Sequence, residues 1–224
     1  MAGIILVLSA HANAGQTTIT VNLASALARQ GHRVLIAEKG ENKKLRAWLG
    51  FDRAADRPMP SSGQMMPGTV ATRIGTDFWM MKDAERILPE IAVDYEYVFL
   101  LPATSAGCEN LLPRCDRILV CCSLEEKDTA RQVVDLDQHL SSLTGRPQPI
   151  DLVVMNKINT KEWHNNLECF SLLADHFGEE RIADPLPHCE RIHDLPLDGR
   201  TVWELSQENL QDAFRRLTEI IAAW

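Results

Sequence analysis

The chain has 224 residues, of which 45% are hydrophobic, and it carries a formal net charge of −8. This length and apolar content suffice for a single domain over residues 1–224, and no linker-like composition divides them. The acidic balance excludes a protein that coats nucleic acid through its overall field, because phosphate neutralisation needs clustered Lys and Arg. No apolar run approaches the roughly 20 residues that span a bilayer, and no targeting segment is recognisable, so we expect a cytoplasmic protein without a membrane partner.

The first thirty residues predict a strand, a turn and a helix. Residues Gly3–Ser9 form a short, continuous apolar run, as expected of a strand buried on both faces of a parallel sheet. Apolar residues then recur at helical spacing over residues 17–30, until Gly31 ends the helix. Between these elements lies the stretch His11-Ala12-Asn13-Ala14-Gly15-Gln16-Thr17-Thr18-Ile19.

This stretch has the character of a phosphate-binding loop that lacks its lysine. A turn from a strand into a helix points successive backbone N–H groups, and the positive end of the helix dipole, at one spot. An anion can therefore be held there by the main chain alone. We expect the loop to remain a phosphate-binding site.

Further strands are predicted at residues 33–37, 78–82, 95–101, 116–122 and 151–156, and less regularly at 181–186. Helical patterns separate most of them, which predicts an α/β fold with a mainly parallel central sheet and helices on both faces. Residues 52–68 lose all periodicity and predict a long surface loop. The apolar stripe of the last helix, which ends at Trp224, predicts core packing rather than membrane binding.

Side chains outside the loop support few other functions. The six cysteines show no CxxC spacing and predict buried free thiols instead of disulfides or zinc ligands. Two small basic groups could form a DNA-binding patch, although solvated helix surface is the expectation for both; they are Lys39, Lys43, Lys44 and Arg46, and Arg215 with Arg216.

The order of these segments resembles the ParA/MinD family of dimerising P-loop ATPases, whose members typically read KGGxGKTT at the first loop. Here residues 11–18 occupy that position, and residues 95–101 resemble the family's YDYIIID strand. Residues 115–120 resemble its next strand, and residues 153–157 resemble the strand whose terminal Asn commonly contacts adenine. The resemblance implies the P-loop NTPase fold that ParA, MinD and the nitrogenase iron protein share.

The second half of the chain resembles one branch of that family in particular. Residues 186–192 and 199–202 are similar to the IPRSVRI…GKPV segment of plasmid and chromosome partition ParA proteins. Nearly the whole chain is therefore covered in the family's order.

The residues that carry the family's chemistry are altered. Its two loop lysines are replaced by His11 and Gln16, and the position of its Walker-B Asp is Leu101. The strand end that should read Asp, Leu, Asp is Glu38-Lys39-Gly40. Glu38 could replace the missing carboxylate and Lys39 the missing cation, although solvent-facing side chains are the expectation for both. Four charged groups are thus altered together, so efficient hydrolysis is not expected.

The resemblance still implies a site for ATP or ADP with Mg²⁺. Thr17 matches the hydroxyl that ligates Mg²⁺, Asn156 matches the adenine-contacting Asn, and no residue is assigned a catalytic role. The residues expected to bind nucleotide are Asn13, Ala14, Gly15, Gln16, Thr17, Thr18, Asn156 and Pro187. For Thr17 and Thr18, capping of the following helix is the alternative role.

Three functions remain open at this stage. The first is a divergent ParA-like partition or positioning protein, a homodimer that recruits a partner or adaptor protein and hydrolyses ATP weakly or not at all. The second is a nucleotide-independent pseudo-ATPase scaffold of a pilus, conjugation or polysaccharide-secretion system. The third is a weak ATPase, in which Lys39 or Lys43 replaces the missing lysines.

Overall fold

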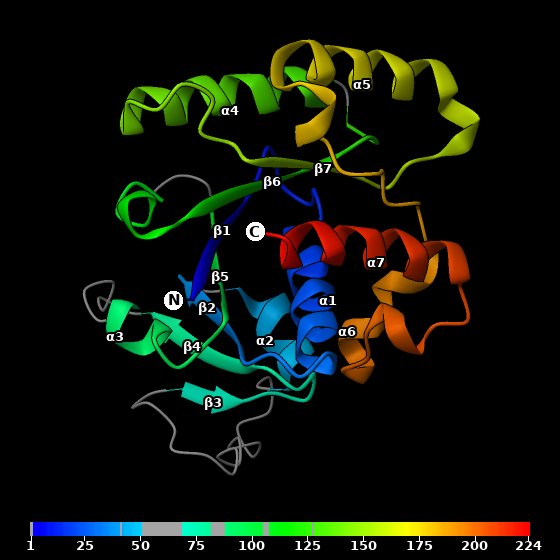
Figure 1. Ribbon diagram of the computed structural model, residues 1–224. Coiled ribbons are helices and arrows are strands. Elements are labelled where there is room, and N and C mark those ends of the chain that lie inside the picture. Colours follow the sequence, from blue (N-terminus) through cyan, green and yellow to red (C-terminus); the bar gives the residue numbers. More distant parts are fainter. Residues whose placement is uncertain (1, 41, 51–68, 82–87, 105–107, 127) are drawn as a thin grey trace.

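The computed structural model describes residues 2–40, 42–50, 69–81, 88–104, 108–126 and 128–224. The predicted loop 52–68 lies outside these ranges. A seven-stranded sheet runs through the molecule in the order β3-β4-β2-β5-β1-β6-β7 (Figure 1). Six strands are parallel, as predicted: β1 (Gly3–Ser9), β2 (Val34–Lys39), β4 (Asp77–Met81), β5 (Tyr97–Pro102), β6 (Arg117–Ser123) and β7 (Leu152–Asn156). The short edge strand β3 (Thr69–Ala71) pairs antiparallel with β4 and was not predicted.

Helices cover both faces of the sheet. Alternate residues of each inner strand enter two separate apolar clusters, which explains why the strands are apolar throughout. One face packs against α1 (Gln16–Arg29), α2 (Lys43–Leu49), α6 (Leu195–Asp198) and α7 (Glu208–Ala222). The other packs against α3 (Leu88–Ala92), α4 (Thr129–Thr144) and α5 (Trp163–Phe177).

Helix α1 is buried over most of its length, because it lies between the sheet and α7 (Figure 1). The helix begins directly after Gly15, and the chain changes direction at Gly31, just beyond its end. Both glycines have positive φ. The apolar stripe of α7 is buried at Leu210, Phe214 and Leu217, so the prediction of core packing is confirmed. No helix in the described ranges combines the length and apolar character needed to cross a membrane.

The predicted strand at 181–186 is wrong. This segment is irregular and makes only a single bridge to β7, between Ile182 and Val153. The N–H groups of Ala183 and Leu186 still donate to β7 carbonyls, at 2.9 and 2.8 Å. Prolines at 185 and 187 lack the N–H that a regular ladder requires, so the segment follows the sheet edge without joining it.

All six cysteines are free thiols, and five of them are buried. Desolvation raises the pKa of Cys115 to about 12 and that of Cys169 to about 11. These two thiols are therefore protonated and weakly nucleophilic at neutral pH.

Candidate functional site

The loop between β1 and α1 leaves its backbone donors free. Asn13 and Gly15 have φ of 61° and 104°, which turns the chain sharply before the first helical residue, Gln16. No hydrogen-bond acceptor within the described ranges meets the backbone N–H groups of residues 13–18. Neither Thr17 nor Thr18 caps the helix, since the N-cap residue is Gly15 and no side-chain cap forms. The loop can offer these amides to an anion.

Asn156 holds the loop from the end of β7. Its Nδ2 atom donates to the carbonyl oxygen of Ala14 at 3.0 Å, and its Oδ1 atom accepts from the N–H of Lys157 at 2.9 Å. A Cβ at Gly15 would overlap the Nδ2 atom of Asn156, so only glycine fits there. Asn156 therefore positions the loop, and its expected contact with adenine stays a prediction.

A cavity of about 810 Å³ opens at the carboxyl ends of the parallel strands, beside this loop. Ligands of open α/β sheets bind at this edge. All eight residues that the sequence assigned to nucleotide binding line the cavity, although they come from segments more than 130 positions apart: Asn13, Ala14, Gly15, Gln16, Thr17, Thr18, Asn156 and Pro187.

The cavity is basic, in contrast to the acidic chain as a whole. None of the described residues that line it is acidic. Three lysines and two histidines line it: Lys43, Lys44, Lys157, His188 and His193. Of these, the sequence analysis named only Lys43 as a possible replacement cation in the site. Lys157 directly follows Asn156, and that adjacency was a usable signal; no local pattern marked His188 or His193.

The lysines differ in their surroundings. Lys157 pairs with Glu125 at 2.8 Å, whereas no carboxylate in the described part of the chain lies within ion-pair distance of Lys43 or Lys44. Lys44 is exposed, yet the atoms around its amine desolvate it and Lys157 repels it, so the pKa of Lys44 is lowered. An anion in the cavity would relieve that repulsion.

Gln16 does not extend into the cavity as a substitute for lysine. Its Nε2 atom donates to the carbonyl oxygens of Val7, at 2.7 Å, and Pro102, at 3.2 Å. These contacts connect the first turn of α1 to the ends of β1 and β5. The side chain is thus used to hold the loop onto the sheet.

His11 is likewise bound within its own chain. Its Nε2 atom accepts from the N–H of Ser123 at 3.2 Å and lies 3.1 Å from Thr129 Oγ1, while Nδ1 lies 2.9 Å from the carbonyl oxygen of Ala12. These contacts require a neutral ring with its proton on Nδ1. The residue at the family's first-lysine position therefore links the loop to the start of α4.

Glu38 corrects the sequence analysis, which expected its side chain to face solvent. It is fully buried, pairs with Arg46 at 3.0 Å and accepts from the N–H of Asn42. Asn42 caps α2 by accepting from the N–H of Leu45 at 3.0 Å, and its Nδ2 atom donates to Thr17 Oγ1 at 2.9 Å. A continuous set of contacts therefore connects the loop to α2.

Solvated helix surface is the expectation for the two basic groups, and the Arg215 and Arg216 side chains are 56% and 55% exposed. Arg46 is engaged with Glu38, Arg216 pairs with Asp184 at 2.6 Å, and Arg215 pairs with Asp212. Such pairing does not leave these arginines as a free cationic surface.

The residues around the cavity fit a divalent cation poorly. Leu101 is buried in the core, 1% exposed, and Glu38 is already neutralised by Arg46. Mg²⁺ is usually held by one or two carboxylates in addition to the phosphates of its substrate. Here the described lining offers the neutral hydroxyls of Thr17, Thr18 and Ser9 and no carboxylate.

Comparison with known proteins agrees with this architecture. Residues 5–202 match the model of a family described as the CobQ/CobB/MinD/ParA nucleotide binding domain. No curated protein sequence matches the chain. Among solved structures, a chain of the MinC:MinD cell division protein complex of Aquifex aeolicus superposes with a TM-score of 0.78 and 18% identity, covering 99% of this chain and 96% of that one.

Two further structures share the fold. A ParA family ATPase from Chlorobium tepidum TLS has a TM-score of 0.73 and 14% identity, over 98% of this chain and 99% of its own. Cobyrinic acid a,c-diamide synthase from Mycobacterium smegmatis, solved with an ATP analogue and magnesium, has a TM-score of 0.74 and 16% identity, over 99% and 94%. At these identities the likeness establishes the fold.

Proposed function

Because the chain belongs to the CobQ/CobB/MinD/ParA nucleotide-binding family, we propose that it is a divergent partition or positioning protein in which ATP or ADP acts as a conformational ligand. The observation that carries this proposal is the cavity. Its loop amides are free and its lysines supply positive charge, so it suits a polyphosphate. Pro187 and Ile192 add apolar lining that could contact a base.

Hydrolysis would be weak or absent. Removing one preorganised electrostatic donor commonly lowers a rate by about 10²–10³, and here Gln16 and His11 are bound to their own chain. Leu101 cannot accept or donate a proton, and the Glu38 carboxylate is held by Arg46. The described lining of the cavity offers no other carboxylate to orient an attacking water.

Through the contacts from the loop to α2, a bound ligand could change the shape of the protein. Asn42 Nδ2 donates to Thr17 Oγ1, so the Thr17 hydroxyl proton stays available to an anion, and Asn42 also caps α2. An anion that reorients the Thr17 hydroxyl would therefore act on α2 through Asn42. A shift of α2 would alter the surface around the cavity. We propose that this surface forms a homodimer and recruits a partner protein, as the MinC:MinD complex of A. aeolicus illustrates for that relative.

The proposal is tested by light scattering of the purified protein with and without ATP and Mg²⁺, with phosphate release followed in the same samples. We expect the mass to double when ATP is added, and phosphate release to equal that of Thr17→Ala. An unchanged mass in the presence of saturating ATP would contradict the nucleotide switch.

A nucleotide-independent scaffold, such as an accessory of a pilus, conjugation or polysaccharide-secretion system, is the second candidate. The contacts of Gln16 with Val7 and Pro102 favour it, because they hold the loop in place without any ligand. A dimer that forms without ATP, and persists in Thr17→Ala, would support the scaffold over the switch. Phosphate release above that of Thr17→Ala would instead indicate a weak ATPase that uses Lys43.

A further inference from the structure

We propose that the cavity binds the polyphosphate of its nucleotide without a divalent cation, with Lys43 and Lys44 supplying the countercharge from α2. This inference rests on the proposed nucleotide function and departs from the magnesium role that the sequence assigned to Thr17. It follows from the metal donors that the cavity lacks and from the cations that it contains.

The donor set gives the first argument. A cation bound beside a triphosphate is usually completed by a carboxylate, directly or through water. Leu101 stands where the family resemblance places the Walker-B Asp, and it is buried in the apolar core. Glu38, at the end of β2, has both carboxylate oxygens engaged, one by Arg46 and one by the N–H of Asn42. The described residues also contain no group of three His, Cys, Asp or Glu side chains placed to share a metal ion.

The positions of the two lysines give the second argument. Asn42 fixes the start of α2 against the loop, because its side chain both caps that helix and donates to Thr17 at 2.9 Å. Lys43 and Lys44 follow directly and line the same cavity as the free amides of residues 13–18. In the described part of the chain neither lysine meets a carboxylate. Unpaired cations that share a cavity with unpaired amides match a multiply charged anion.

Electrostatics within the cavity support the same ligand. The pKa of Lys44 is lowered by desolvation and by the charge of Lys157, so without an anion these groups repel one another. A triphosphate would reverse this repulsion. A hydrated magnesium ion placed among the lysines would add to it.

Isothermal titration of the purified protein tests the inference, with ATP in buffer containing EDTA and in buffer containing excess MgCl₂. We expect ATP to bind in EDTA at least as tightly as with Mg²⁺. Binding that becomes about tenfold weaker in EDTA, or is lost, would overturn the inference. If binding is retained with Mg²⁺, the proposed nucleotide function survives that result; if ATP binds in neither buffer, both fail.

Substitution of the lysines identifies the source of the charge. Lys43→Gln and Lys44→Gln should each weaken ATP binding in EDTA by about tenfold, as expected for loss of a hydrogen bond to a charged group. Lys161→Gln is the matched control, because Lys161 is exposed and does not line the cavity. If Lys43→Gln and Lys44→Gln bind ATP as tightly as the control Lys161→Gln, the assignment of the countercharge to Lys43 and Lys44 is overturned. Melting temperatures verify that each variant is folded.

Inorganic tripolyphosphate separates the phosphate contacts from those of the base. It should displace ATP in EDTA, and this displacement should weaken in the variant that carries both Lys43→Gln and Lys44→Gln. Tripolyphosphate that fails to compete would overturn the inference, because affinity would then come from the nucleoside alone.

Discussion

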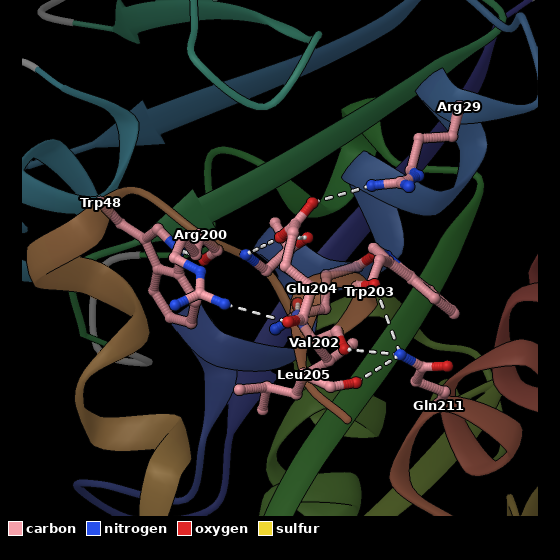
Figure 2. A network of polar contacts seen from close by, with 10 residues as sticks. Arg29, Trp48, Arg200, Val202, Trp203, Glu204, Leu205 and Gln211 are labelled. Atoms are coloured by element: carbon pink, nitrogen blue, oxygen red, sulfur yellow. Dashed lines mark hydrogen bonds and ion pairs between the residues drawn. The ribbon is translucent and has the colours of Figure 1, made fainter. Parts of the chain in front are cut away.

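Helix α1 contacts two regions of the molecule that differ in how many of their polar and charged groups have partners within the chain. Its first turn borders the cavity, where backbone amides are free and, among the described residues, Lys43 and Lys44 have no carboxylate partner. Its middle and end contact the segment of residues 200–211, where the polar groups of Arg200, Thr201, Glu204 and Gln211 are hydrogen-bonded within the chain (Figure 2). Asn22 joins this second region to the helix: its Oδ1 atom accepts from the N–H of Val202 at 2.8 Å.

The second region is held together entirely by the chain itself. Gln211 Nε2 donates to the carbonyl oxygens of Val202, Trp203 and Leu205, and Trp48 Nε1 donates to that of Arg200 at 2.6 Å (Figure 2). The contacts within this second region are thus separate from the groups that line the cavity. The two regions should therefore respond differently to substitution.

The largest expected effect is at Arg46, which pairs with the buried Glu38 beneath the start of α2. In Arg46→Ala the fully buried carboxylate of Glu38 loses its partner, which should lower the free energy of unfolding by about 3 kcal/mol. This value is the lower end of the range for a broken buried ion pair, because the Arg46 side chain is 22% exposed. Urea unfolding measures this loss. Arg215→Ala, at an exposed pair, is the control and should change stability by less than about 0.5 kcal/mol. A similar loss in both variants would contradict the account.

Gly15→Ala should impair both the loop and the cavity. A side chain at φ of 104° costs about 1–2 kcal/mol, and its Cβ would overlap Asn156 Nδ2. We expect a loss of about 2 kcal/mol in urea unfolding and no detectable heat on ATP titration. Adding Asn156→Ala should restore part of the stability by removing the overlap. If the double variant loses the full sum of the two single losses, Asn156 does not set the requirement for glycine.

Glu204→Gln should affect the second region alone. Burial by itself would raise the pKa of Glu204, but hydrogen bonds from Thr201 and Arg29 outweigh it, and the pKa is lowered. A lowered pKa stabilises the fold above the unfolded-state value, near 4.3, and this contribution is lost as pH falls through the folded-state value. The variant should therefore be less stable than the parent protein at pH 7, and by a smaller margin at pH 3, with unchanged ATP affinity. If the stability difference between the parent protein and Glu204→Gln grows as the pH is lowered, the account of Glu204 is contradicted.

Lys44 should give the smallest effect, a pH dependence of ATP binding. Because its pKa is lowered, Lys44 loses its proton at a pH below the ordinary lysine value of about 10.4. Affinity for ATP, measured by titration calorimetry, should fall as pH rises from neutral toward the ordinary lysine value, and the fall should be smaller in Lys44→Gln. Parallel profiles for the two proteins would exclude Lys44 as the titrating group.

The sequence predicted most of the fold because its inner strands are buried on both faces and therefore read as continuous apolar runs. The family resemblance supplied the expected site residues, and all eight line one cavity because the strand ends of a parallel sheet meet at one edge. It misplaced Glu38 because the partner, Arg46, approaches only after the chain turns into α2. It could not assign Lys44 to the cavity, since that position depends on how Asn42 docks on Thr17.

A crystal structure of the protein grown with ATP and EDTA tests the central claim most directly. The account predicts a triphosphate bound by the backbone N–H groups of residues 13–18, with the amines of Lys43 and Lys44 on its outer oxygens and Gln16 still bonded to Val7 and Pro102. A cavity without nucleotide, or a triphosphate that avoids both lysines, would contradict it.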